Sequence, residues 1–220
     1  FPLSTFINVG DLPMGKGFAI ILSAPSGTGK TTTCNRLREK LPDLKFAVSH
    51  TTRTIRNGEK EGVDYIFISQ KEFEDKIRNK DFLEWARVHD FYYGTSLQLA
   101  DTLLRNGCDT LLELDVQGVE TLREMQYQGI YILILPPSIE EMRSRLRKRG
   151  TNSEESIQQR IETGKKEIKK YKMYDYVITN HEIENTVNAI LSILQAEKVK
   201  VSHYIPPSPD IAELLKDGVD

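Results

Sequence analysis

The sequence has few cysteines and no long apolar run. Only Cys34 and Cys108 occur among 220 residues, too few for a disulfide scaffold, so we expect free thiols and a reducing compartment. The most apolar stretch, "IYILIL", is cut short by Pro136, whereas a bilayer span needs about 20 apolar residues. We therefore expect no membrane partner and a cytoplasmic location.

An excess of positive charge is also missing. Thirty basic and 32 acidic residues give a formal net charge of -2, so nothing in the overall charge favours nucleic acid or an anionic membrane. The four histidines, at positions 50, 89, 181 and 203, have no spacing typical of a metal site. Any bound anion must therefore be held by local geometry rather than by net charge.

Strands and helices alternate along the chain, which predicts one α/β domain with a mainly parallel sheet flanked by helices. Residues 1–13 are expected to be a disordered leader or extension, and 201–220 a peripheral tail. A polar segment with Gly58 and Gly62 predicts a small strand-rich insertion. Core strands are expected at 18–22, 108–116, 129–135 and 174–179, and helices at 30–41, 73–80, 95–105, 117–125, 139–148, 153–170 and 182–199.

A glycine-rich stretch, "APSGTGKTT", stands between the first expected strand and helix. It matches the phosphate-loop pattern G-x-x-x-x-G-K-[ST], except that Ala24 replaces the first glycine. A tight loop without a ligand is the alternative, but the strand–loop–helix context favours phosphate binding. The predicted phosphate-binding residues, which the resemblance described below assigns to ATP, are Ala24, Pro25, Ser26, Gly27, Thr28, Gly29, Lys30, Thr31 and Thr32.

The polar insertion carries a second group of candidates. Arg53 and Arg56, three residues apart, and Tyr65 could hold a terminal phosphate through charge-assisted hydrogen bonds, although such arginines are also common on a solvated surface. Downstream, a carboxylate at Glu84 and a hydroxyl at Thr95 complement the donors and acceptor of guanine. Adenine would place an acceptor against the carboxylate.

Six stretches together resemble the guanylate kinase family: "SAPSGTGKTT", "SHTTRTIRNGEKEGVDYIF", "FLEWA", "YYGT", "LELDVQG" and "RKRGTNSEESIQQR". The resemblance runs from Gly17 to about Val199. It implies a phosphate-loop kinase of three parts within 14–200: a core (14–47, 96–145 and 172–200), a GMP-binding insertion (about 48–95) and a helical lid (about 146–171).

The resemblance also implies residue roles. Around the GMP phosphate it places Ser49, Arg53, Arg56, Tyr65 and Tyr93, and at the guanine Glu84 and Thr95, with Asp115 nearby. At the ATP triphosphate it places Arg149 and Arg160, with Arg145 a further candidate, and at the adenine the loop that holds Asn180. Glu113 departs from the family pattern, in which an aspartate is common. By itself the cluster "RSRLRKRG" would also fit a nucleic-acid patch or a solvated helix face.

The implied reaction is Mg²⁺-dependent transfer of the γ-phosphoryl group of ATP to GMP, and to dGMP. The phosphate of GMP is already anionic, so no general base is needed. Lys30, Arg53, Arg149 and Arg160 are expected to stabilise the transferred group, and Thr31 to bind Mg²⁺. Two alternatives stay open: a non-catalytic phosphopeptide-binding module of the same fold, and a kinase for another nucleoside monophosphate. The oligomeric state is not predicted.

Overall fold

Two β-sheets organise the part of the chain that the structure describes, which in this computed structural model is residues 17–56, 58–88, 90–148, 153–204, 206 and 208–216. The first sheet has the strand order β2-β7-β1-β8-β9, and all its neighbours are parallel. Its strands are β1 (Ala19–Ser23), β2 (Lys45–Phe46), β7 (Thr110–Leu114), β8 (Ile130–Leu135) and β9 (Tyr176–Thr179). The predicted mainly parallel sheet is confirmed.

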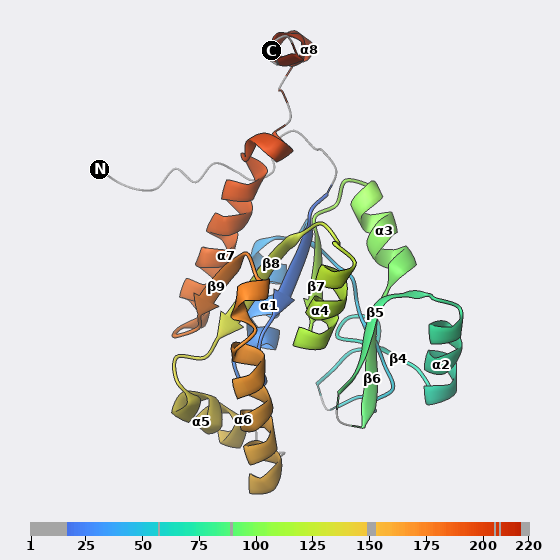
Figure 1. Ribbon diagram of the computed structural model, residues 1–220, viewed down its shortest axis with the longest axis vertical. Helices are drawn as coiled ribbons and strands as arrows, with labels where there is room; N and C mark the ends of the chain where they lie inside the picture. The colour runs from blue at the N-terminus through green and yellow to red at the C-terminus, as the bar shows by residue number, and fades with distance from the viewer. Residues whose placement is uncertain are drawn as a thin grey trace.

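Helices cover both faces of this sheet (Figure 1). They are α1 (Lys30–Lys40), α3 (Leu97–Arg105), α4 (Val116–Glu124) and α7 (Ile183–Lys198). Along β1, Ala19 and Ile21 face a core shared with α3 and α4, while Ile20 and Leu22 face a core shared with α1 and α7. Because side chains alternate along a strand, the apolar run of β1 is buried on both sides, as its sequence predicts.

The second sheet, of order β4-β3-β6-β5, is formed by the predicted insertion. Its strands are β3 (His50–Thr51), β4 (Ile66–Phe67), β5 (Phe82–Val88) and β6 (Phe91–Ser96). Helix α2 (Gln70–Arg78) packs on it, with the Phe73 ring stacked on Phe82 at 4.4 Å between centroids. A capping box of Ser69 and Glu72 starts α2, which satisfies two backbone donors at its N-terminus.

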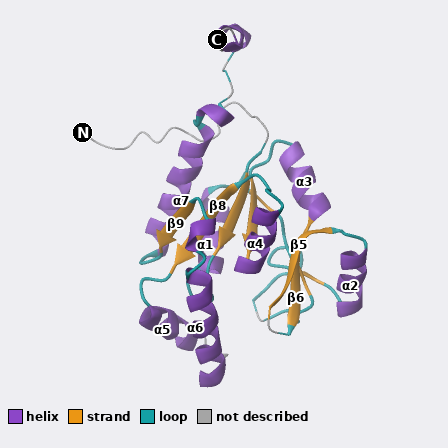
Figure 2. Cartoon of the chain, in the orientation of Figure 1, coloured by secondary structure: helices purple, strands orange, loops and turns teal. Residues whose placement is uncertain are grey.

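Two further helices extend from the core next to the phosphate loop. They are α5 (Ile139–Lys148) and α6 (Glu154–Ile168), which bury a small cluster of their own: Met142, Leu146, Ile157 and Ile161. In Figures 1 and 2 this pair and the second sheet lie on opposite sides of the core, both at the end toward which β1 points. That end holds the carboxyl termini of the parallel strands, where α/β proteins commonly bind ligands.

Some expected helix boundaries differ from the structure. The helix expected at 73–80, α2, spans Gln70–Arg78. The helix expected from residue 95 begins at Leu97, because Thr95 and Ser96 are the last residues of β6. Thr95 is paired with Glu84 across the β5–β6 hairpin, and the Ser96 hydroxyl caps α3 by accepting a hydrogen bond from the Leu99 N–H. The sequence pattern did not reveal this hairpin, which decides where Glu84 and Thr95 stand.

The remaining elements complete the chain. A single turn of 3-10 helix (Tyr171–Met173) precedes β9, another (Val201–His203) follows α7, and α8 (Pro209–Lys216) lies apart from the core in Figure 1. The predicted leader, residues 1–13, falls outside the described residues. Within the described part of the chain, no helix combines the length and apolar character that crossing a membrane requires.

The packing of α1 against the first sheet can be tested at Leu37, which is fully buried. We expect Leu37→Ala to lower the free energy of unfolding by about 2–5 kcal/mol, because it removes apolar contacts and leaves a cavity. Urea denaturation measures the change. Leu97→Ala, at a side chain that is 43% exposed, is the control and should cost less than about 1 kcal/mol. Equal stability of Leu37→Ala and the wild type would contradict this packing.

Candidate active site

The glycine-rich loop curls between β1 and α1 as its sequence predicts. Gly27 and Gly29 have φ values of 86° and 103°, a left-handed conformation that residues with a Cβ rarely adopt. There is no room for a side chain at Gly29 either, since a Cβ would lie 2.7 Å from Nδ2 of Asn180. Helix α1 starts at the next residue, Lys30, so its N-terminal N–H groups point toward the loop.

Two side chains from other segments fix the loop by donating hydrogen bonds to the Thr28 carbonyl. The Asn180 Nδ2 donates a hydrogen bond to this oxygen at 2.7 Å, and the Arg145 Nη1 donates a second at 2.9 Å. Arg145 also bonds the Asn180 carbonyl at 3.1 Å, and the Thr186 hydroxyl donates to the Asn180 Oδ1 at 2.8 Å. Because Asn180 is fully buried, its side chain supports the phosphate loop; its predicted contact with adenine stays a prediction.

Lys30 lies against the end of β7. Its ammonium donates to the Leu114 carbonyl at 3.1 Å and stands 3.5 Å from the Glu113 carboxylate. Burial lowers the pKa of Lys30, but the negative charge of Glu113 and weaker neighbours outweigh it and leave the pKa above its usual value. Lys30 therefore keeps its positive charge at the mouth of the loop. Glu113, to which the sequence assigned no role, pairs with this lysine.

Of the two arginines predicted to reach the ATP triphosphate from the lid, the structure describes Arg160 but not Arg149. Arg160, on α6, donates from Nη1 to the Ser26 hydroxyl at 3.2 Å, so α6 contacts the phosphate loop directly. Arg149 lies outside the described residues, and its role stays a prediction. Thr31 and Thr32 are exposed in the first turn of α1.

The predicted guanine-reading residues meet inside the second sheet. Glu84 is 6% exposed, and its Oε1 accepts a hydrogen bond from the Thr95 N–H at 3.1 Å. The Thr95 hydroxyl lies 3.3 Å from that of Ser49. Burial raises the pKa of Glu84 to about 7, and the negative charge of Asp115 adds to this effect. This carboxyl can therefore change its charge near neutral pH.

Asp115 approaches the same place from the core. Its carboxylate caps α4 by accepting from the Gly118 N–H at 2.8 Å. A Cβ on Gly118 would lie 2.6 Å from Oε2 of Glu84, so this glycine lets the insertion close onto the core. Five consecutive residues, 114–118, thus contact Lys30 at one end and Glu84 at the other, which brings the two predicted nucleotide sites together.

The predicted phosphate-binding residues of the insertion form a separate group. Arg53 is 6% exposed and makes two hydrogen bonds with Glu59, at 2.8 and 3.0 Å. Its guanidinium carbon is 5.4 Å from the centre of the Tyr65 ring, which lies 5.8 Å from the Tyr93 ring. Burial, with the charge of Glu113, raises the pKa of Tyr65 to about 12, so this hydroxyl stays protonated and able to donate. Arg56 is exposed nearby.

Comparison with known proteins relates the whole domain to one family. The family model described as Guanylate kinase matches residues 16–197. The chain is 43% identical over 206 residues to the guanylate kinase of Clostridium tetani, covering 94% of this chain and 97% of the relative. It is 44% identical over 186 residues to that of Caldanaerobacter subterraneus, covering 84% and 90%.

The chain belongs to the guanylate kinase family. Among solved structures it is similar to guanylate kinase from Anaplasma phagocytophilum, with a TM-score of 0.73 and 34% identity over 94% of this chain and 97% of that one. The fold class and the family predicted from the sequence are therefore confirmed. As a member of this family, the protein is an enzyme of the nucleotide-binding kinase class.

A magnesium ion fits the donors present. Among the described residues, no group of three or more histidine, cysteine or acidic side chains is arranged to hold a metal by itself. Mg²⁺ commonly keeps several waters and binds through substrate phosphates and one or two protein oxygens. The exposed hydroxyl of Thr31, next to Lys30, suits that arrangement.

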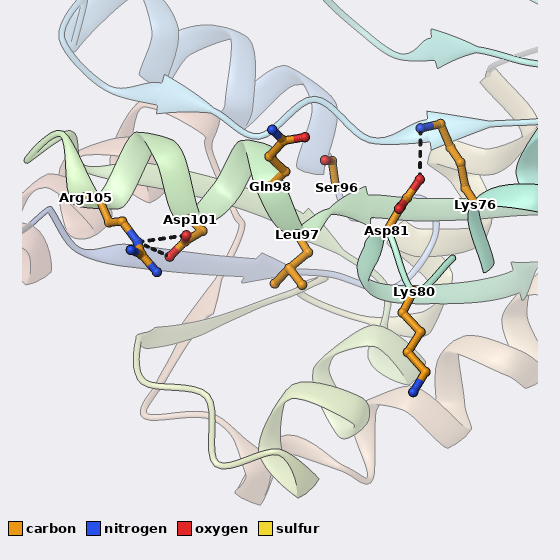
Figure 3. Close-up of a pocket in the computed structure, with 8 residues that line it drawn as sticks. All are labelled: Lys76, Lys80, Asp81, Ser96, Leu97, Gln98, Asp101 and Arg105. Carbon is orange, nitrogen blue, oxygen red and sulfur yellow. Dashed lines mark hydrogen bonds and ion pairs between the residues drawn. The ribbon is translucent and has the colours of Figure 1, made fainter. Parts of the chain in front are cut away.

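A cavity away from the predicted nucleotide sites is lined mainly by charged and polar side chains. It measures about 500 Å³ and lies outside the predicted nucleotide sites, against α2 and α3. Figure 3 shows that four of its charged groups pair with one another: Asp101 with Arg105, and Lys76 with Asp81. The described residues of the predicted sites do not line it. Its lining residues are Lys76, Lys80, Asp81, Ser96, Leu97, Gln98, Asp101 and Arg105.

Sequence reasoning missed Glu59 and assigned Arg145 to ATP alone. Glu59 is one of several acidic residues in a polar stretch, and only its two bonds with Arg53 single it out. Burial raises its pKa, but the hydrogen bonds from Arg53 and the Arg56 N–H outweigh this and hold the pKa below its usual value. For Glu59 a signal was present, since arginine and carboxylate side chains commonly pair in this way, but the sequence could not select the partner. For Arg145 there was none, because its bonds outside α5 go to backbone carbonyls.

The pKa of Glu84 predicts how stability depends on pH. The folded-state pKa, about 7, lies above the ordinary value of 4.5, so the folded protein binds this proton more tightly and loses stability as pH rises from about 4.5 through 7. Glu84→Gln removes this loss. Relative to the wild type, the variant should gain up to about 3 kcal/mol between pH 4.5 and 8, since one pH unit between the two pKa values corresponds to about 1.36 kcal/mol.

Urea denaturation across this pH range measures the gain. Glu155→Gln, at an exposed position in α6, is the control for the loss of one negative charge. Parallel pH profiles for Glu84→Gln and the wild type would show that Glu84 is not the titrating group.

Proposed function

We propose that the protein transfers the γ-phosphoryl group of ATP to GMP, giving ADP and GDP. The observation that supports this most is the convergence of two predicted sites at the end of β7. There Lys30 contacts Leu114 at 3.1 Å, and Gly118 lies against the buried carboxyl of Glu84. Direct, in-line transfer requires the two nucleotides to bind next to each other.

The acceptor base is selected by Glu84, Thr95 and Asp115. An ionised Glu84 accepts hydrogen bonds from the N1–H and the exocyclic amine of guanine, while adenine has no donor at N1. Since burial holds the pKa of Glu84 near 7, two guanine donors would favour the ionised form and lower that pKa on binding. The cost of burying the carboxylate is then offset only by a base that supplies both donors.

The acceptor phosphate is held by Ser49, Arg53, Arg56, Tyr65 and Tyr93. Arg53 is already fixed by Glu59 before any ligand binds, and a fixed fork loses less side-chain entropy when it engages a phosphate. The Tyr65 hydroxyl adds a neutral donor. This group lies on the insertion, so movement of the insertion would carry the GMP phosphate toward the phosphate loop.

The donor phosphates are held by the loop from Ala24 to Thr32. Lys30, Arg160 and Arg149 supply positive charge from separate segments, and Mg²⁺, when bound at Thr31 with the ATP phosphates, neutralises part of the charge of the transferred group. Asn180 and Arg145 keep the loop rigid through the Thr28 carbonyl. No general base is required, because a phosphate monoester oxygen is already anionic near neutral pH.

The three-part division of 14–200 belongs to this proposal. The four-stranded sheet and α2 belong to the GMP-binding insertion (about 48–95), and the end of α5 together with α6 belongs to the lid (about 146–171). The contact between Arg160 and Ser26 supports a lid that reaches the loop, and closure would exclude water that competes for the phosphoryl group. The cytoplasmic location and the use of dGMP stay predictions.

The phosphate-loop lysine gives the first test. We expect Lys30→Ala to lower kcat at least about 10²-fold while the protein still folds, because it removes one preorganised charge from the transferred group. A coupled assay of ADP release measures kcat, and circular dichroism checks folding. Lys40→Ala, which removes the pair with Glu184 at the far end of the same helix, is the control. Turnover unchanged in Lys30→Ala would contradict the assignment.

The acceptor preference gives the second test. The same assay with GMP, dGMP, AMP, UMP and dTMP should show the highest kcat/KM for a guanine nucleotide. Glu84→Gln should raise the KM for GMP about 10- to 100-fold, since losing a charge-assisted hydrogen bond and mispairing a donor cost about 1.5–3 kcal/mol. Wild-type GMP kinetics in this variant would argue against Glu84, and inactivity of the unmodified enzyme toward every nucleotide would favour the non-catalytic module.

A further inference from the structure

Arg38 connects the helix that follows the phosphate loop to the insertion. It lies in the last turn of α1, and its Nη2 donates to the Val63 carbonyl at 3.1 Å. Its Nη1 donates to the Asn35 Oδ1 at 3.2 Å, and its guanidinium carbon stands 4.0 Å above the centre of the Phe46 ring. One side chain therefore bridges α1, β2 and the loop between β3 and β4.

The loop that receives this bond is internally hydrogen-bonded and ends at Tyr65. The Val63 and Asp64 N–H groups both donate to the Lys60 carbonyl, at 3.2 and 3.0 Å, and the Gly62 N–H donates to the Tyr65 carbonyl at 2.8 Å. The Lys60 N–H donates to the Asp64 carboxylate at 2.8 Å. Because these bonds join the loop into one unit, fixing the Val63 carbonyl also limits where Tyr65 can stand.

Arg38 also lines a small cavity between the core and the insertion. The cavity joins residues of both nucleotide sites: Ser49 and Tyr65 from the predicted GMP site, and Glu113, the partner of Lys30. Its lining includes Arg38, Phe46, Ser49, Asp64, Tyr65 and Glu113. Arg38 therefore lies between the insertion, which carries Ser49 and Tyr65, and the core, which carries Glu113. The distance between these two parts sets the distance between the two predicted nucleotide sites.

We propose that Arg38 is a positioning residue, which holds the loop that carries Tyr65 at a set place relative to the phosphate-loop helix. The proposal rests on the proposed function only in taking Tyr65 as a ligand of the acceptor phosphate. Arginine suits this role because its planar fork can bond two acceptors and lie over an aromatic ring at the same time. A lysine offers a single point of charge and cannot do both.

Steady-state kinetics test the effect on the acceptor. Arg38→Ala should raise the KM for GMP about three- to tenfold, the loss expected for one hydrogen bond from a charged donor in a partly exposed place. The kcat and the KM for ATP should change less than about twofold. Arg38→Lys should recover part of the loss. Arg36→Ala, on the same helix but paired with Glu39 and Glu184 away from the insertion, should match the wild type.

A double-mutant cycle tests whether Arg38 acts through Tyr65. If it does, Tyr65→Phe should cost less GMP affinity in the Arg38→Ala background than in the wild type, because the hydroxyl is then no longer well placed. Strictly additive losses would overturn the proposal, as would equal KM values for Arg38→Ala and Arg36→Ala.

Amide hydrogen exchange tests the bridge without any assay of activity. Arg38→Ala should speed exchange in residues 60–68, where the Ile66 and Ile68 N–H groups bond the Ser49 and Thr51 carbonyls at 2.9 and 3.0 Å, and should leave β8 unchanged. Unaltered exchange in 60–68 would overturn the proposal even if the enzyme phosphorylates GMP. If the wild type is inactive on GMP but exchange in 60–68 is faster in Arg38→Ala, the proposed function is contradicted and the positioning role of Arg38 is not.

Discussion

The hydrogen bond from the Lys30 ammonium to the Leu114 carbonyl fixes the arrangement on which the site depends. It joins the first residue of α1 to the last residue of β7, which is the neighbour of β1 in the parallel sheet. Because β1 and β7 end at the same edge, the phosphate loop and the residues after β7 must share one space. Asp115 and Gly118 then extend from that point to Glu84 on the insertion.

Positive charge is concentrated here without any excess in the chain as a whole. The net charge is -2, yet Lys30 and Arg53 are both held in partly or fully buried places by carboxylates, Glu113 and Glu59. Each carboxylate offsets the cost of burying a cation and fixes its position. When a phosphate approaches, the cations are already oriented, and electrostatic stabilisation requires little rearrangement.

The phosphate loop is fixed by hydrogen bonds, whereas the insertion and the α5–α6 pair are packed as separate units. The phosphate loop is rigid, since two bonds to the Thr28 carbonyl and two left-handed glycines determine its shape. The insertion and the α5–α6 pair each have packing contacts of their own and stand on opposite sides of that loop. Arg145 bonds α5 to the Thr28 and Asn180 carbonyls, so closure around two nucleotides would involve the insertion and α6 rather than the start of α5.

Much of the core could be predicted from the sequence because its signals are local. A strand buried on both faces is a continuous apolar run, a phosphate loop needs glycine where φ is positive, and helix α5 was expected at 139–148 and observed there. The β5–β6 hairpin was missed because its turn lacks the short glycine signal of a tight hairpin. Thr95 was therefore assigned to a helix, although its antiparallel pairing with Glu84 places it in β6.

By itself, the sequence determined the family, the fold class and the candidate residues: the glycine-rich loop, the basic side chains and the carboxyl of Glu84, since backbone conformation and charge depend on residue type. Only the tertiary structure decided their partners. Glu59 holding Arg53, Asn180 supporting Thr28 and Arg38 reaching Val63 join residues from 6 to 152 positions apart. A side chain in a polar segment has many possible partners at that range, and only the packing of strands and helices selects one of them.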